Sequence, residues 1–474
     1  MKPAEFRKYA HELVEWMAEY MENVESYPVK SAVQPGDILN KLPDSPPADP
    51  ESFESFMNDF EKIIMPGMTH WQSPSFFAYF PANSSPPSVL AEMITSTLAA
   101  QCMIWETSPA AAELEQKVMN WLRDMIGLPP DFEGVIQDTA STATLAAILT
   151  AREKISGFRI NSHGSSGEKH LRVYCSEQTH SSVEKAVKIA GIGKRNLVKI
   201  RVKDDFSIDS SALERAIKED INNGLVPCCV VATLGTTGTT AIDPLQPVGE
   251  ICNRFGIWLH VDAALAGTAL ILPEYQWMLE GKEYIDSFVF NPHKWMFTNF
   301  DCTAYFVRDA DILIKTFEIL PEYLKTRTRG RVNDYRDWGI PLGRRFRALK
   351  LWCVIRMYGV NGLQEKIRFH LSLAAKLSEA ISAESDFEIM APVNLNTVCF
   401  RFRPEGANNE ELNSLNEKLN HLLNDTGRIY LSHTKLNGNY TLRMVTAQTN
   451  VTLNHVEKAW ELIKSTARSL STTA

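Results

Sequence analysis

The chain has 474 residues and a formal net charge of −8, from 49 lysines and arginines against 57 aspartates and glutamates. Its length allows two or three units with cores of their own, and its negative balance gives no basis for binding nucleic acid or an anionic membrane. Hydrophobic residues make up 44%, and no stretch approaches the about 20 consecutive apolar residues of a membrane span, so the composition predicts a soluble protein that acts on small molecules.

The cysteines and the first residues bear on the compartment. Eight cysteines are scattered along the chain without a C-x-x-C pair, which argues against a zinc site and against a disulfide framework. Residues 1–24 place charges among their apolar side chains, unlike the continuous apolar region of a secretion signal. We therefore expect a protein of the reducing cytoplasm.

The N-terminal residues predict an amphipathic helix, because apolar side chains recur at helical spacing on one face: Phe6, Tyr9, Leu13, Trp16, Met17 and Tyr20. Residues 42–50 are proline-rich and predict an extended linker after this helix. The part before the linker should therefore form a separate arm or layer.

The middle of the chain predicts a mainly parallel sheet covered by helices, because apolar runs alternate with amphipathic helical patterns from about residue 134 to about residue 308. The expected strands are residues 171–176, 196–202, 227–235, 257–264, 286–291 and 302–309. The last part contains two long helical patterns, two short apolar runs (397–404 and 439–446) and a final helix from about Asn454. It predicts a smaller α+β domain.

Asp262 and Lys294 stand at the ends of two of these apolar runs. Ligands of open α/β sheets sit beyond the carboxyl ends of the strands, so both side chains should point into one crevice. Pyridoxal 5′-phosphate would use both, because a lysine forms an imine with its aldehyde and a carboxylate keeps its pyridine nitrogen protonated. The alternative is a structural salt bridge.

Two hydroxyl-rich segments indicate an anion site. Thr139, Ala140 and Ser141 precede a strong helical pattern, and a helix start offers free N–H groups to a phosphate. The turn at residues 234–240 follows another apolar run and would add Thr237. Ordinary N-capping is the alternative for the first segment. The chain has neither G-x-G-x-x-G nor G-x-x-x-x-G-K-[ST], which gives nucleotide sites little support.

Two histidines and one polar loop complete the candidates. His180 follows a predicted strand, where its imidazole could stack on a bound ring; His293 stands beside Lys294, and either histidine could instead be structural. Residues 324–334 form a hydrophilic insertion that could act as a mobile lid with Tyr323 at its hinge. The alternative is a plain solvated loop.

Together these motifs resemble the aromatic-L-amino-acid decarboxylases, the group II pyridoxal-phosphate decarboxylases. The resemblance runs through nearly the whole chain, in residues 73–85, 108–115, 134–141, 179–186, 231–245, 258–267, 290–295, 299–302, 321–325 and 334–352. It implies a fold-type-I homodimer with active sites at the subunit interface. The implied domains are an N-terminal helical arm that packs on the partner (1–80), a large cofactor-binding α/β domain (81–350) and a small C-terminal α+β domain (351–474).

The resemblance also implies residue roles. Lys294 would carry the cofactor as a Schiff base, Asp262 would face the pyridine nitrogen and His180 would cover the ring. The phosphate and its surroundings would be contacted by Ala140, Ser141, Asn291 and His293, with Thr237 near the ring. The residues that match the substrate pocket are Trp71, Tyr79, Phe80, Pro81 and Gly343 of the partner subunit. Arg443 matches a position linked to substrate-carboxylate or loop contacts.

The implied reaction converts tryptophan, 5-hydroxytryptophan, tyrosine, dopa or phenylalanine to the arylalkylamine and CO2, with Tyr323 as the proton donor. The alternatives are an aldehyde synthase, whose loop tyrosine is replaced by phenylalanine, and a cofactor-binding homologue without turnover. Gly343 stands where relatives that prefer phenols often carry serine, which favours a pocket that takes indoles. Ala82, Leu265 and Met103 depart from the animal pattern and put the substrate preference in doubt.

Overall fold

The computed structural model describes residues 1–319 and 330–472, and these divide into two compact units. The first unit comprises residues 1–81, 373–390 and 398–474, and the second comprises residues 82–372 and 391–397. The division into three domains at residues 80 and 350 stays a prediction.

The second unit is built on a seven-stranded sheet with the order β1-β7-β6-β5-β4-β2-β3. Neighbouring strands from β3 to β6 run parallel, and β7 runs antiparallel to both of its neighbours. The predicted mainly parallel sheet is thus confirmed. The strands are β1 (Glu133–Gln137), β2 (Leu171–Ser176), β3 (Leu197–Ile200), β4 (Val226–Thr233), β5 (Trp258–Asp262), β6 (Ser287–Phe290) and β7 (Thr303–Val307).

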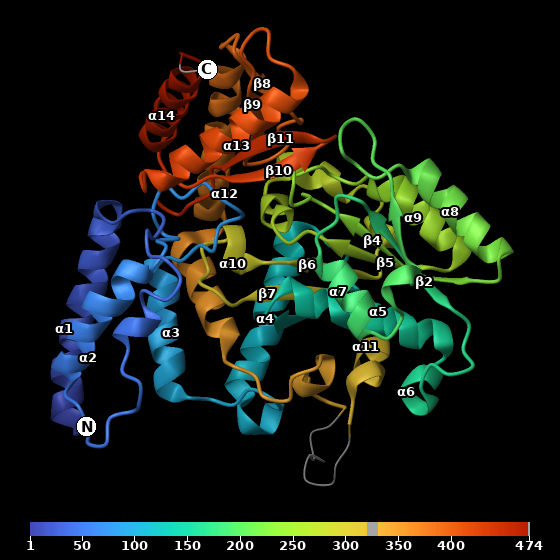
Figure 1. Ribbon diagram of the computed structural model, residues 1–474. Coiled ribbons are helices and arrows are strands. Elements are labelled where there is room, and N and C mark those ends of the chain that lie inside the picture. Colours follow the sequence, from blue (N-terminus) through green and yellow to red (C-terminus); the bar gives the residue numbers. More distant parts are fainter. Residues whose placement is uncertain (320–329, 473–474) are drawn as a thin grey trace. The chain divides into compact units, whose positions relative to one another are not determined.

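Helices cover this sheet on both sides, as the view in Figure 1 shows: α8 and α9 lie above the strands, and α5, α7 and α11 lie below them. Every residue of β5, β6 and β7 is buried, which explains why these strands read as continuous apolar runs. The helices before α12 in this unit are α3 (Pro86–Leu98), α4 (Pro109–Ile126), α5 (Ala140–Ser156), α6 (Arg159–His163), α7 (Ser182–Ile189), α8 (Ser210–Asn222), α9 (Leu245–Phe255), α10 (Pro292–Trp295) and α11 (Ala310–Phe317).

Helix α5 has local signals at both of its ends. Thr139 is its N-cap, and the Thr139 hydroxyl accepts a hydrogen bond from the backbone N–H of Thr142. Gly157 follows the helix with a φ of 61°, which favours glycine, and the N–H of Phe158 donates to the carbonyl of Glu153 at 2.8 Å. The two caps fix both ends of α5, and two residues separate its start from the end of β1.

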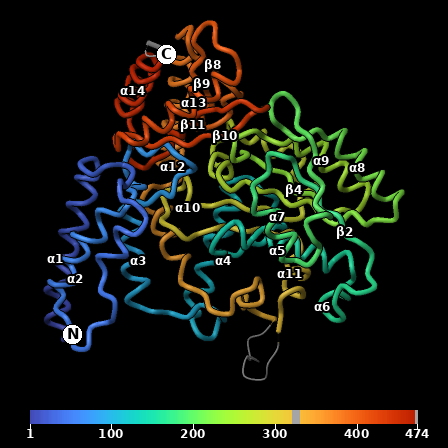
Figure 2. Tube along the Cα trace, viewed as in Figure 1, coloured from blue at the N-terminus to red at the C-terminus, as the bar shows by residue number. Residues whose placement is uncertain are grey.

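The first unit contains the predicted N-terminal helix and a smaller antiparallel sheet. Helices α1 (Pro3–Asn23) and α2 (Phe53–Asp59) lie side by side, as Figure 2 shows, and the rings of Tyr9 and Phe53 are 4.7 Å apart. Phe6, on the predicted apolar face, is nevertheless 61% exposed. The sheet has the order β10-β11-β9-β8. The remaining elements are β8 (Phe387–Ile389), β9 (Thr397–Phe402), β10 (Ser432–Leu436), β11 (Asn439–Val445), α13 (Asn409–Asp425) and α14 (Leu453–Thr472).

The two long helical patterns of the sequence correspond to α12 (Arg347–Ser382). Gly359 interrupts this element with non-helical backbone angles, φ 66° and ψ 166°. A positive φ suits glycine because it has no Cβ. The glycine therefore separates the two predicted helical stretches.

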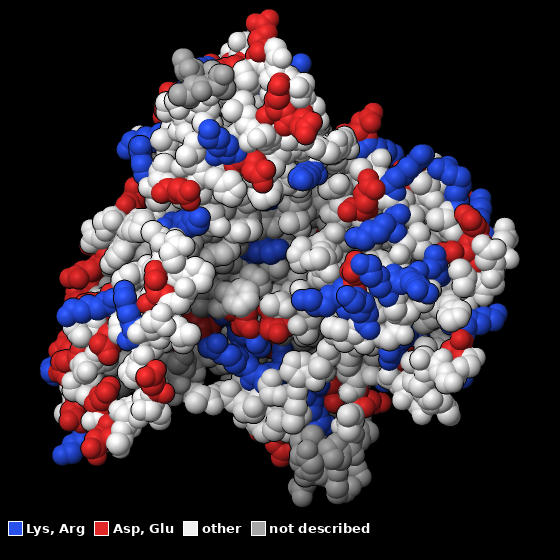
Figure 3. All heavy atoms as spheres, viewed as in Figure 1, with Lys and Arg blue, Asp and Glu red and all other residues white. Residues whose placement is uncertain are grey.

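Charges of both signs appear on the face of the protein shown in Figure 3, in keeping with the modest net charge. Within the described residues, no helix has the length and apolar character needed to cross a membrane. All eight cysteines lie in this part of the chain and carry free thiols.

Candidate active site

Asp262 is the last residue of β5, between the ends of β4 and β6. It is in register with Thr233 on one side and Val289 on the other, and it is 4% exposed. One carboxylate oxygen accepts a hydrogen bond of 3.0 Å from the backbone N–H of Ala264. The side chain is therefore held at the carboxyl edge of the sheet, where ligands of such sheets bind.

Lys294 follows β6, the strand next to β5 in the sheet. After β6, Asn291 precedes the short helix α10, and the N–H of Lys294 donates to the carbonyl of Asn291 at 2.9 Å. Burial of the amine lowers the pKa of Lys294, and the negative charge of Asp262 partly opposes this effect. A lowered pKa favours the neutral amine, which is the form that attacks a carbonyl carbon.

His180 reaches the same place from the loop between β2 and α7. Its Nδ1 atom is 2.9 Å from the hydroxyl of Ser182 and accepts from the Ser182 N–H at 3.2 Å. His180 is exposed, but partial burial and the charge of Lys294 lower its pKa, while the charge of Asp262 raises it. The structure thus brings His180, Lys294 and Asp262 within range of one another's charge.

The start of α5, which follows strand β1 of the same sheet, offers backbone N–H donors. Ala140 and Ser141 are its first two residues, so their N–H groups have no acceptor within the helix. The side chain of Ser141 is exposed, and Thr303 of β7 donates from its hydroxyl to Asn291 Oδ1 at 2.8 Å. A helix start of this kind suits a phosphate.

His293 points into the protein. It is 4% exposed, and its Nδ1 accepts a hydrogen bond of 2.9 Å from the backbone N–H of Cys302. Burial, followed by the charge of Lys294, lowers the pKa of His293 to about 3. The imidazole is therefore neutral at neutral pH and holds the segment after α10.

Thr237 lies in the turn that follows β4, and its side chain is exposed. The turn is stabilised from inside by two buried residues that the sequence analysis does not single out. The hydroxyls of Thr236 and Thr239 are 3.2 Å apart, and Thr236 Oγ1 accepts from the N–H of Ala241 at 3.1 Å. Thr240 is buried as well, so Thr237 is the exposed threonine of this turn, a difference that the sequence TTGTT does not show.

These groups fit pyridoxal phosphate by their chemistry. The amine of Lys294 suits its aldehyde, and the carboxylate of Asp262 suits a protonated pyridine nitrogen. The N–H groups at the start of α5 suit the phosphate, and the exposed imidazole of His180 suits the ring. The donor set therefore matches each functional group of the cofactor.

Two of the predicted substrate residues of the first unit, Trp71 and Tyr79, are in ring contact, and a third, Phe80, lies beside Arg443. The rings of Trp71 and Tyr79 are stacked at 5.9 Å, and the guanidinium of Arg443 lies 5.6 Å from the ring centre of Phe80. Arg443 is 3% exposed and donates from Nη1 to the hydroxyl of Ser432 at 2.7 Å. Pro81 is the last residue of the N-terminal segment of this unit.

Gly343 lies in the second unit, before α12. The next residue, Arg344, donates its backbone N–H to the side-chain oxygen of Gln101 at 2.7 Å, and its guanidinium donates to the buried Glu115 at 2.6 Å. A Cβ atom at Gly343 would lie 3.3 Å from Gln101 Nε2, which is a tight contact. Gln101 is a neighbour that sequence reasoning missed. Tyr323 lies outside the described residues.

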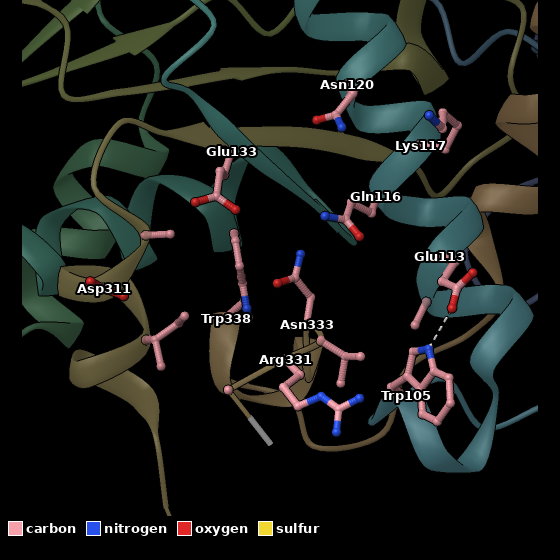
Figure 4. A pocket seen from close by; sticks show the side chains of 15 residues that line it. Trp105, Glu113, Gln116, Lys117, Asn120, Glu133, Asp311, Arg331, Asn333 and Trp338 are labelled. Carbon is pink, nitrogen blue, oxygen red and sulfur yellow. Dashed lines mark hydrogen bonds between the residues drawn. The ribbon is translucent and has the colours of Figure 1, made fainter. Parts of the chain in front are cut away.

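A pocket of about 710 Å³ in the second unit lies elsewhere, between α4, β1 and α11 (Figure 4). Its labelled side chains are mostly polar, and Trp105 donates from Nε1 to Glu113 at 2.9 Å. None of the predicted catalytic, cofactor or substrate residues lines it, but residues 330–333 of the predicted lid do. The volume of this pocket therefore does not identify the site that Asp262, Lys294 and His180 indicate.

Comparisons with known proteins agree with this chemistry. The pyridoxal-dependent decarboxylase conserved domain matches residues 35–403. Tyrosine decarboxylase 4 of Petroselinum crispum is 43% identical, covering 99% of this chain and 94% of the relative. Phenylacetaldehyde synthase of Arabidopsis thaliana is 41% identical, covering 99% and 97%. The solved structure of Oryza sativa TDC with PLP and tryptamine has a TM-score of 0.96 at 38% identity and covers 99% of both chains.

The relatives extend over nearly the full chain, and the family match at residues 35–403 includes both Asp262 and Lys294. The fold of the second unit, with its mainly parallel sheet, is that of fold type I. The protein therefore belongs to the pyridoxal-dependent decarboxylase family, the group II carboxy-lyases that use pyridoxal 5′-phosphate.

Proposed function

We propose that this protein decarboxylates aromatic L-amino acids to arylalkylamines and CO2, with the cofactor held on Lys294. The observation that carries the proposal is the convergence of Lys294, Asp262 and His180 at the ends of strands in one sheet. The names of the relatives support an aromatic substrate, since one is a tyrosine decarboxylase and one solved structure holds tryptamine.

The cofactor, when bound, supplies an electron sink for the pair that the departing CO2 leaves behind. We assign Lys294 to binding the aldehyde carbon through its neutral amine, and Asp262 to keeping a proton on the pyridine nitrogen. His180 covers the ring and excludes water from that face. These assignments agree with the lowered pKa of Lys294, which favours the neutral amine.

Further residues bind the ends of the cofactor and the substrate. Ala140 and Ser141 offer their N–H groups to the phosphate, and Asn291 and His293 hold the segment beside it. Thr237 lies near the ring. We assign the aromatic side chain of the substrate to the residues Trp71, Tyr79, Phe80, Pro81 and Gly343 of the partner subunit, and we expect the missing side chain at Gly343 to favour indoles.

The protein is proposed to act as a homodimer, which its resemblance to the aromatic-L-amino-acid decarboxylases implies and which the exposure of large apolar side chains in each unit allows. Phe6 is 61% and Phe56 57% exposed in the first unit, and Leu98 is 59% exposed in the second. The expected mass in solution is twice the 53.4 kDa of one chain. Light scattering after size-exclusion chromatography measures this mass, and a monomer that remains fully active would contradict shared active sites. We also propose a cytoplasmic location, which imaging of a fluorescent fusion tests.

The direct test of the function is a product panel on purified holoenzyme. We expect CO2 and the amine in equal amounts from at least one of tryptophan, 5-hydroxytryptophan, tyrosine, dopa and phenylalanine. Cofactor binding without release of CO2 from any of them would favour the non-catalytic alternative. Equal amounts of aldehyde, ammonia and hydrogen peroxide in place of the amine would favour an aldehyde synthase, whose reaction consumes one O2 and one water per amino acid.

The aldehyde-synthase alternative has support in the relatives, because one of them is named phenylacetaldehyde synthase. Tyr323→Phe removes only the hydroxyl that we assign to protonating the α-carbon. We expect CO2 release to continue while the amine falls and aldehyde, ammonia and peroxide rise. Parallel assays under air and under argon measure the change, with Tyr358→Phe as a control hydroxyl loss. Amine formation at the parent rate under air would require another proton donor, with His180 the next candidate.

A further inference from the structure

Asp243 is a fully buried carboxylate, 0% exposed, to which the proposed chemistry gives no role. One carboxylate oxygen accepts from the backbone N–H of Ile208 at 2.7 Å, and the other accepts from the N–H of Thr233 at 2.7 Å. The backbone N–H of Asp243 also donates to the carbonyl of Thr233 at 3.0 Å. Asp243 thus forms hydrogen bonds with both the N–H and the carbonyl of Thr233 and with the backbone N–H of Ile208.

Thr233 connects this carboxylate to the cofactor side of the sheet. It is the last residue of β4 and is in register with Asp262, and the next N–H, that of Leu234, donates to the carbonyl of Asp262 at 2.9 Å. The turn that carries Thr237 begins there and closes when the N–H of Gly235 donates to the carbonyl of Ala241. The position of Thr233 therefore affects both the turn and the backbone of Asp262.

Two backbone N–H donors require a carboxylate at this position, because a carboxylate offers two acceptor oxygens. The N–H groups of Ile208 and Thr233 each use a different oxygen of Asp243. An asparagine has one side-chain oxygen, so its amide N–H2 would face one of the two N–H donors and leave that donor unpaired. A buried unpaired donor costs roughly 1–3 kcal/mol.

We propose that Asp243 is a positioning residue, whose carboxylate fixes the end of β4 so that Asp262 and the Thr237 turn stay in place against the pyridine ring. The proposal rests on the proposed function for the orientation of that ring. It does not require Asp243 to touch the cofactor. Its expected signature is a change in how tightly the cofactor binds and in the environment of its ring.

Burial makes Asp243 titrate in an accessible range. Burial raises the pKa of Asp243 to about 7, the two N–H donors lower it, and the charge of Asp205 raises it. The buried thiol of Cys175 also interacts with Asp243. Because the folded protein then binds a proton that the unfolded chain has lost, the contribution of Asp243 to stability falls as pH rises from about 4 to about 7.

The test compares Asp243→Asn with Asp205→Asn, a matched control. Asp205 is exposed, and its two hydrogen bonds, from the Ser207 N–H and hydroxyl, use one oxygen that asparagine retains. For Asp243→Asn at alkaline pH we expect the dissociation constant of pyridoxal phosphate to rise at least about tenfold. The absorbance per bound cofactor should also change. Asp205→Asn should stay within about twofold of the parent at that pH, because it keeps its acceptor.

A second measurement covers the case in which Asp243→Asn does not fold. Removing the charge of Asp205 should move the ionisation of Asp243 to lower pH. The midpoint of the pH-dependent change in cofactor affinity should move in the same direction in Asp205→Asn. Unchanged affinity and absorbance in folded Asp243→Asn, or an unmoved midpoint in Asp205→Asn, would overturn the proposal. A holoenzyme that binds the cofactor but makes no amine would instead contradict the proposed function alone.

Discussion

Lys294→Ala is expected to abolish turnover and the covalent attachment of the cofactor. Lys294 extends from the carboxyl edge of the sheet beside Asp262, and burial lowers the pKa of its amine toward the neutral, nucleophilic form. Without this amine the aldehyde of the cofactor has no group to bind covalently. The expected loss of kcat exceeds about 10³-fold, the scale on which removal of a covalent catalyst acts.

Borohydride reduction followed by mass spectrometry of the peptides measures this attachment directly. The parent protein should carry the reduced cofactor on Lys294, and Lys294→Ala should carry none. Lys199→Ala is a suitable control, because Lys199 is exposed on the edge strand β3. A reducible adduct together with full activity in Lys294→Ala would show that the site lies elsewhere.

The sequence predicts the strands of the main sheet other than β1, and burial is the physical reason. Strands β2, β3, β5, β6 and β7 fall within predicted apolar runs, and β4 begins one residue before its run, since the central strands are buried on both faces. Strand β10 has only its first and last residues buried, in the sequence SHTKL, so it carries little apolar signal. Strand β1 lies outside the predicted strands. Its short segment ends directly before the helix start that dominates the local pattern.

The candidate site shows the same limit. The rule that ligands bind beyond strand ends is enough to place Asp262 and Lys294 together from their positions in the sequence. Asp243 gives no such signal, because an aspartate followed by Pro244 and a helix reads as an ordinary helix start. Its contact with Ile208 depends on tertiary packing. Gln101 likewise meets Arg344 across 243 residues of sequence, a separation at which no local pattern acts.

Asp262→Asn is expected to lower kcat by about 10²–10³-fold, which is the usual cost of removing one preorganised electrostatic group. The substitution keeps the shape of the side chain and an oxygen that can accept from the N–H of Ala264, but it removes the negative charge beside the pyridine nitrogen. That charge also raises the pKa of Lys294 and of His180, so both pKa values should fall further in the variant. Steady-state kinetics and NMR titration of His180 measure these two effects.

Thermal unfolding of the cofactor-free protein separates this role from a structural salt bridge. If Asp262 only paired with Lys294 to hold the fold, removing its charge would break a buried ion pair, which typically costs about 3–5 kcal/mol. We expect a much smaller loss, because the amine of Lys294 already has a lowered pKa and can remain neutral. A loss of stability large enough to account for the fall in kcat, with normal kcat in the fraction that stays folded, would establish the salt bridge instead. A stable variant with normal kcat would contradict both roles and would require another group to keep the pyridine nitrogen protonated.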